Sequence, residues 1–148
     1  MRDKIARSIA TVFGAGYLPL MPGTFGSIAG LLVYLYIKAN LTVYIGTIVI
    51  ATILGFIVSR MAKRLFYYDD PGEVVIDEFC GMLITYMFIP PTAPNIVAGF
   101  FLFRIIDILK VPPLGRLERV KGGAGIMLDD IGAGVIANVI LRVINIIF

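Results

Sequence analysis

The sequence predicts an all-α protein: a compact helical bundle, integral to a membrane, with four to five apolar helices plus an N-terminal helix at the membrane interface. Apolar residues make up 59% of the 148 residues and charged residues only 16%, against roughly 45–50% and about 25% in an ordinary soluble domain. The mean hydropathy is +0.94. The apolar residues gather in five runs that are too long and too rich in Leu, Ile and Ala for strands. A soluble helical bundle is the alternative, but five such runs leave too little polar surface to coat one.

The first expected element is an amphipathic helix over roughly residues 2–13 that lies at the membrane interface. Arg2, Lys4 and Arg7 precede a short apolar stretch without a convincing cleavage site. We therefore interpret this segment as part of the mature protein rather than as a signal peptide.

Five apolar runs follow, and the second of them can span a bilayer. It has 18 residues without a charge, and a transmembrane helix needs about 17–25 residues. The first run is short and would span only by tilting or with help from residues 22–26. The five runs cover residues 27–37, 41–58, 79–89, 95–103 and 131–148.

The basic residues predict how the runs are oriented. They cluster at 2–7, 60–64 and 104–121, whereas the loops at 38–42 and 90–95 hold one Lys between them. By the positive-inside rule the three clusters are cytoplasmic. The apolar runs then cross in alternating directions, within a single domain over residues 1–148.

Eight of the ten acidic residues fall near the predicted cytoplasmic ends of these helices. The spacing of Asp70, Glu73 and Asp77 predicts one face of a helix, on which like charges repel. The helix macrodipole accounts for one or two acids at helix N-termini, but not for eight. Grouped carboxylates are the ligands of a hard cation, Mg²⁺ above all or Mn²⁺. The eight are Asp69, Asp70, Glu73, Asp77, Glu78, Asp107, Asp129 and Asp130.

Two cations are interleaved with the acids. Arg104, Asp107 and Lys110 are spaced i, i+3 and i+6, again one helical face. Arg offers a planar fork to a phosphate and Lys a point charge. An internal salt bridge to Asp107 is the other interpretation, and both can hold.

A Gly-rich stretch, residues 14–27, leads directly into the first apolar run. Thr24 or Ser27 can cap that helix, and its free backbone N–H groups favour an anion. A capped start packed by small residues is the alternative. The stretch is neither a Walker A loop nor a dinucleotide fingerprint. The chain has no His and one Cys, which excludes imidazole chemistry, an internal disulfide framework and a cysteine-based zinc site. The net charge of +3 fits a membrane surface better than nucleic acid.

Four segments, in this order along the chain, resemble the blocks of the phosphatidylglycerophosphatase A family: residues 22–27, 70–78, 103–110 and 123–134. The similarity runs from about residue 13 to 138. The resemblance implies a bacterial inner-membrane enzyme that requires Mg²⁺ and dephosphorylates phosphatidylglycerophosphate to phosphatidylglycerol. Its active site should face the cytoplasm, because the acids lie at the predicted cytoplasmic ends of the helices and the lipid head must reach water. Two departures leave the charged residues in place: Val111 follows Lys110 where the family usually has Pro, and Gly72 stands where Ser is commoner.

The expected mechanism is metal-assisted hydrolysis of a phosphate monoester. Glu78 or Asp107 would orient the water or act as base, and a covalent aspartyl-phosphate intermediate stays open. Besides the lipid substrate, membrane lipids are the expected partners, and the oligomeric state is left open. Metal ligands would be Asp70, Glu73, Asp77, Asp129 and Asp130; the phosphate would bind Arg104 and Lys110, helped by Gly23, Thr24, Gly26 and Ser27.

A divalent-cation-binding or transport membrane protein without phosphatase activity is the rival, because intramembrane acids often mark ion pathways. Against it, the acids lie at helix ends and none is mid-span.

Overall fold

The computed structural model confirms the all-α class. It describes residues 2–67, 71–110, 112, 114–117 and 124–147, and no strand occurs among them. The elements are α1 (Arg2–Ala10), the short 3₁₀ turn η1 (Ala15–Tyr17), α2 (Pro22–Ile37), α3 (Leu41–Arg60), α4 (Ala62–Phe66), α5 (Ile76–Thr85), α6 (Ala93–Leu109), α7 (Leu114–Leu117) and α8 (Ala124–Ile147).

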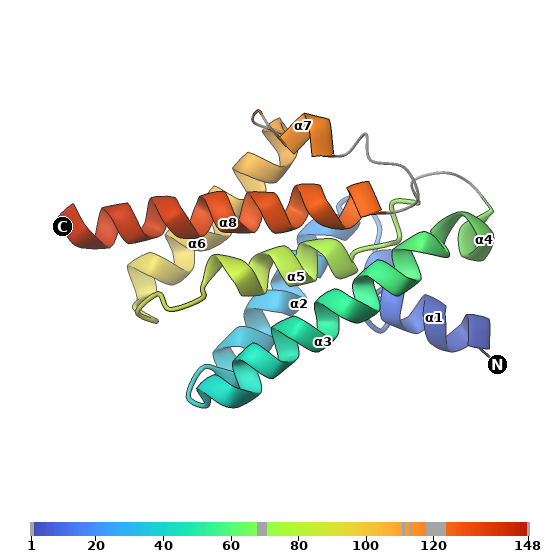
Figure 1. Ribbon diagram of the computed structural model, residues 1–148, viewed down its shortest axis with the longest axis horizontal. Coiled ribbons are helices and arrows are strands. Elements are labelled where there is room, and N and C mark those ends of the chain that lie inside the picture. The colour runs from blue at the N-terminus through green and yellow to red at the C-terminus, as the bar shows by residue number, and fades with distance from the viewer. Residues whose placement is uncertain (1, 68–70, 111, 113, 118–123, 148) are drawn as a thin grey trace.

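Helix α5 lies at the centre of the bundle, surrounded by α2, α3, α6 and α8 (Figure 1). Nine of its ten residues are buried. Its closest neighbour is α8, because both helices present glycine at the contact. A Cβ on Gly134 would lie 2.4 Å from the carbonyl oxygen of Gly81, and a Cβ on Gly81 would lie 2.6 Å from that of Asp130. This close approach places the start of α8 directly against the start of α5.

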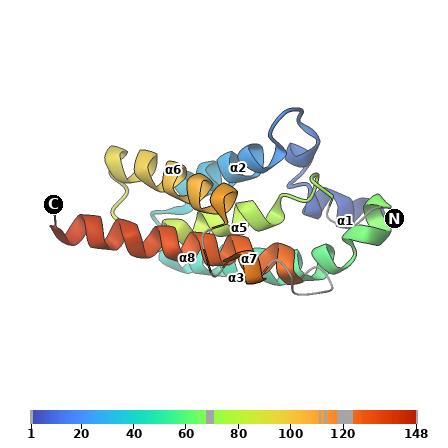
Figure 2. The same ribbon diagram turned by 90° about the horizontal axis from the view of Figure 1, so that it is seen from above.

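The helices alternate in direction between two ends of the bundle (Figures 1 and 2). Helices α2, α5 and α8 begin toward the end where α3 and α6 stop. The α2–α3 turn and the α5–α6 connection lie at the opposite end, where α8 also stops. The arrangement is consistent with the orientation predicted from the basic clusters.

Only α3 and α8 are long and apolar enough to cross a membrane among the described helices. The expectation of four to five spanning helices is therefore not confirmed. At 1.5 Å per residue, α5 is only about 15 Å long, half the hydrocarbon thickness of about 30 Å. Its apolar run continues past the helix, which stops at Thr85. On α3, Ile50, Ile53 and Ile57 are more than half exposed, which suits a surface in contact with lipid.

Helix α1 ends at Ala10, three residues earlier than expected. Val12 and Phe13 adopt positive φ values of 47° and 55°, which break the helix. The Thr11 hydroxyl donates to the Arg7 carbonyl and accepts from the Gly14 N–H, so the chain turns here toward η1. The interfacial placement of α1 stays a prediction.

Candidate functional site

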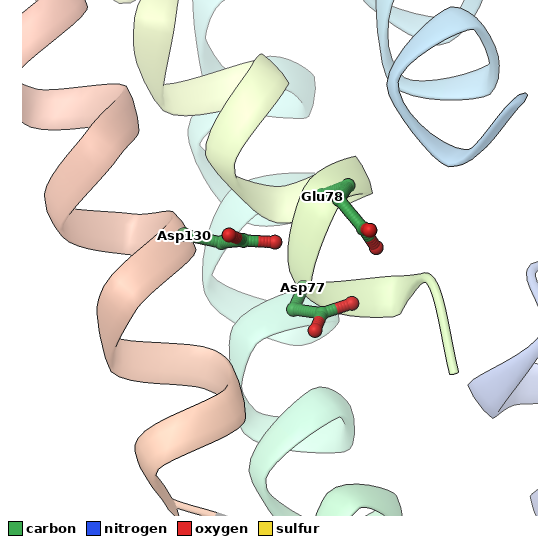
Figure 3. Close-up of side chains that lie close together, drawn as sticks. All are labelled: Asp77, Glu78 and Asp130. Atoms are coloured by element: carbon green, nitrogen blue, oxygen red, sulfur yellow. The ribbon is translucent and has the colours of Figure 1, made fainter. Parts of the chain in front are cut away.

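Three carboxylates lie close together around the start of α5, and one of them, Asp130, points toward α5 from α8 (Figure 3). Asp77 and Glu78 lie in the first turn of α5, and Asp130 lies in the second turn of α8. One carboxylate oxygen from each lies within 4.8 Å of the others. We call these three residues the carboxylate cluster.

The chemistry of the cluster fits a hard cation. Asp77 Oδ1 and Glu78 Oε2 are buried without a hydrogen-bond partner among the described residues. Burial, followed by the charge of Glu78, raises the pKa of Asp77 well above its ordinary value. Burial also raises the pKa of Glu78. A Mg²⁺ ion takes oxygen ligands and would relieve both the repulsion and the unmade bonds.

The predicted helical face of Asp70, Glu73 and Asp77 is wrong. Helix α5 begins at Ile76, so Glu73 lies in the turn before it, and Asp70 lies outside the described residues. Pro71 and Gly72 explain the difference, because neither suits a helix interior. Glu73 instead packs its carbonyl oxygen against η1.

That turn fixes where α5 begins. A Cβ on Gly16 would lie 1.9 Å from the Glu73 carbonyl oxygen, so only glycine fits beneath the turn. The Val75 N–H donates to the Ala10 carbonyl at 2.9 Å, and Gly26 of α2 packs directly on Val75. The carboxylates of the next turn are therefore held by α1, η1 and α2 together.

Two residues of the predicted helical face, Arg104 and Asp107, lie on α6 as expected. Lys110 does not, because α6 ends at Leu109 and Lys110 is its C-cap residue with a left-handed φ of 46°. Arg104 Nη1 donates to Asp107 Oδ2 at 2.6 Å, and both side chains are only 13% and 15% exposed. The internal ion pair is thus present. Lys110 Nζ lies 3.7 Å from Asp129 Oδ2, which places Asp129 toward α6 rather than with its neighbour Asp130.

The start of α2 completes the site. A Cβ on Gly23 would lie 2.2 Å from Glu78 Oε1 and 3.4 Å from Arg104 Nη1. Ser27 Oγ donates to the Gly23 carbonyl at 2.9 Å and accepts from Arg104 at 3.4 Å. The expected capping role is wrong: the helix begins at Pro22, and its N-cap residue is Met21, with no side-chain cap. The Thr24 hydroxyl is buried without a partner among the described residues.

Two features were missed from the sequence. Glu78 was expected to orient water, yet it lies within the cluster beside Asp77. Adjacent residues on a helix do not face each other, so their spacing gave no sign of convergence. The close approach of Gly23 to Glu78 brings together two residues that are 55 positions apart in the sequence. No local sequence pattern predicts such a contact.

The chain is similar to known phosphatases. The family model for phosphatidylglycerophosphatase A matches residues 8–145. Phosphatidylglycerophosphatase A of Escherichia coli (strain K12) is 38% identical over 140 residues, 93% of this chain and 81% of the relative. The Haemophilus influenzae protein of that name is 35% identical, over 93% and 86%.

A Bacteroides thetaiotaomicron protein named "Putative phosphatidylinositol-3-phosphatase" is 33% identical over 144 residues, 91% of this chain and 90% of the relative. No solved structure matches the chain. The family match covers nearly the whole chain, and relatives at 35–38% identity share the phosphatase name. The chain is therefore a phosphatase and belongs to the phosphatidylglycerophosphatase A family.

Proposed function

We propose that the protein hydrolyses the terminal phosphate of phosphatidylglycerophosphate, releasing phosphatidylglycerol and inorganic phosphate, with Mg²⁺ held by the carboxylate cluster. The observation that carries the proposal is the meeting of three carboxylates within 4.8 Å beside the half-buried Arg104. Arg104 is a cation of the kind that binds phosphate oxygens. Asp70, Glu73 and Asp129 stay predicted as further metal ligands.

When bound, Mg²⁺ supplies charge neutralisation for the phosphate and a lowered pKa for a coordinated water. Arg104 and Lys110 orient the phosphate oxygens and stabilise the charge that develops in the transition state. Asp107 holds Arg104 in place through their 2.6 Å contact. Glu78 or Asp107 accepts the proton of the attacking water. The bond between phosphorus and the glycerol oxygen breaks as the water oxygen bonds to phosphorus, and the carboxyl group that took the proton of the water returns it to the glycerol oxygen.

We also propose that the protein resides in the bacterial inner membrane with this site facing the cytoplasm. The two candidate spanning helices, α3 and α8, support membrane residence. The cluster lies at the end of the bundle that carries the N-terminal basic residues (Figure 1), which the positive-inside rule places in the cytoplasm.

A phosphoinositide monoester is a second candidate substrate, favoured by the name of the Bacteroides thetaiotaomicron relative. The same cation and Arg104 would bind the phosphate of either lipid. The two candidate substrates therefore differ only in the rest of the headgroup, glycerol or inositol. A transport protein is the less favoured rival, because the carboxylates lie at helix ends.

Phosphate release by the detergent-purified protein tests these alternatives. We would supply phosphatidylglycerophosphate or phosphatidylinositol 3-phosphate, first with Mg²⁺ and then with excess EDTA. We expect Mg²⁺-dependent release from phosphatidylglycerophosphate that is strongly reduced in Asp77→Asn. It should be retained in Asp3→Asn, a control in an exposed ion pair with Arg64. Release from the phosphoinositide alone would favour the second substrate. Release undiminished by EDTA would refute the metal role.

A further inference from the structure

A second concave site lies on the other side of α5 from the carboxylate cluster. A cavity of about 530 Å³ opens between α1, α2, α3 and α5, within the size range of sites that hold small molecules. Eleven of its twelve lining residues are apolar, and Thr47 is the exception. Ile76 and Phe79 line it from α5, whereas Asp77 and Glu78 between them turn toward the cluster.

The depth of this cavity indicates what can fill it. Along α3 it extends from Leu54 to Thr47, roughly 9 to 20 Å from Arg60 at 1.5 Å per residue. Helix α3 is one of the two candidate membrane spans, so this depth corresponds to hydrocarbon and favours an apolar occupant. Leu32 and Ile50 at the rim are 60% and 61% exposed, which leaves the cavity open to the bilayer between α2 and α3.

We propose that this cavity binds an acyl chain of the phospholipid substrate, an inference that rests on the proposed function. Two helices contribute to both sites. Ile76 in the cavity wall directly precedes Asp77 of the cluster, so one end of the cavity reaches the first turn of α5, where the cluster lies. Helix α2 places Gly23 beside Glu78 and Ala29 in the cavity. Both sites therefore adjoin the first turn of α5 and helix α2, and the bound lipid would place its headgroup at the cluster and one chain in the cavity.

Photolabelling provides the direct test. The wild-type protein in detergent receives either phosphatidylglycerophosphate or phosphatidylcholine that carries a diazirine on the same acyl chain, with EDTA present to block turnover. We expect labelled peptides from α2 and α3 at the cavity, several-fold more with phosphatidylglycerophosphate. Equal labelling by both lipids would show a bulk-lipid site and overturn the proposal, as would labelling confined to other surfaces.

Kinetics supply the second test. Ala29→Phe adds a ring to the cavity, and Val97→Phe adds the same ring to an exposed position on α6 outside it. We expect Ala29→Phe to lower kcat/KM roughly tenfold or more for the dipalmitoyl substrate, the discrimination that an apolar pocket can give. The deacylated headgroup should be hydrolysed as by wild type, and Val97→Phe should leave both rates unchanged. An equal loss on both substrates would contradict acyl-chain binding.

The two tests separate this inference from the proposed function. A wild-type protein that releases no phosphate from phosphatidylglycerophosphate would refute the proposed function on its own. Labelling of the cavity by that lipid would then still report binding of its chain. Normal turnover together with no labelling of the cavity would refute the acyl-chain site alone.

Discussion

The two ends of the helical bundle differ in how completely their buried polar groups are hydrogen-bonded. Where α5 stops, Asn138 of α8 donates from Nδ2 to the carbonyls of Thr85 and Met87, both at 2.9 Å. Its Oδ1 accepts from Arg142 Nε at 2.8 Å. Every donor and acceptor of this amide is therefore used. The polar network at this end is complete without any ligand.

Where α5 starts, the same two helices carry a network that is incomplete. Asp77, Glu78 and Asp130 place three carboxylates together, with buried oxygens that lack hydrogen bonds among the described residues. A complete buried network contributes stability, whereas an incomplete one opposes folding. The comparison indicates that hydrogen bonds hold α5 and α8 together at one end. At the other end, which we call the open end, the unsatisfied carboxylates suit a charged ligand.

Asp77→Asn should produce the largest effect and separate the two ends most clearly. We expect kcat to fall by roughly 10²–10³-fold, the loss seen when one preorganised electrostatic group is removed. In EDTA, the melting temperature should stay equal or rise, because a buried repulsive charge is gone. Thermal unfolding and phosphate release on one preparation measure both. A large loss of stability with normal turnover per folded molecule would show that the carboxylate is structural.

Asn138→Ala should do the reverse. It leaves the buried Thr85 carbonyl without its Asn138 partner and removes one hydrogen bond from the Met87 carbonyl, which still accepts from Arg142 Nη2 at 3.0 Å. An unsatisfied buried group costs about 1–3 kcal/mol. We therefore expect a clearly lower melting temperature in detergent, with the rate per folded molecule retained. Loss of catalysis at an unchanged melting temperature would contradict the view that the Asn138 end of the bundle serves stability and not catalysis.

Much of this arrangement could be predicted from the sequence. The apolar runs predict the order of α2, α3, α5, α6 and α8, because hydropathy reports burial in protein or lipid alike. For the same reason it overstates the number of spanning helices. Helix α5 is apolar because protein surrounds it. In the sequence, its short apolar run cannot be told from a short run that faces lipid.

The carboxylate cluster could be predicted only in part. The concentration of acids in an acid-poor chain predicted that Asp77 and Asp130 lie close together, and the structure places them in one cluster with Glu78. Their role as metal ligands stays a prediction. The prediction from helical spacing was wrong at Glu73. The i, i+3, i+7 spacing assumes one continuous helix, but Pro71 and Gly72 impose a turn before α5 begins. Asp129 and Asp130 are adjacent in sequence, yet Lys110 lies 3.7 Å from Asp129 while Asp130 faces α5. Which neighbour each of these two aspartates contacts depends on tertiary packing, which no local sequence pattern encodes.

Gly23→Ala should have a moderate effect, confined to the open end. Its Cβ would lie 2.2 Å from Glu78 Oε1, so the carboxylate must swing away from the cluster. A misplaced group can cost up to about 10²-fold in rate, and we expect a loss of around tenfold with little change in stability. Gly46→Ala is the matched control, since nothing lies within 4 Å of a Cβ there. Equal activities for the two variants would remove the argument for close packing at Glu78.

The smallest effect expected is a pH-dependent stabilisation by Mg²⁺. Burial and Glu78 raise the pKa of Asp77, so without metal the folded protein holds this proton more tightly than the unfolded chain. That contribution to stability is full below the ordinary Asp pKa and is lost as pH rises through the raised value. Mg²⁺ binds the deprotonated cluster and should restore stability most at the higher pH. Melting temperatures with Mg²⁺ and with EDTA should therefore diverge from acidic to alkaline pH in wild type and converge in Asp77→Asn. A difference independent of pH in wild type would show that the cation binds elsewhere.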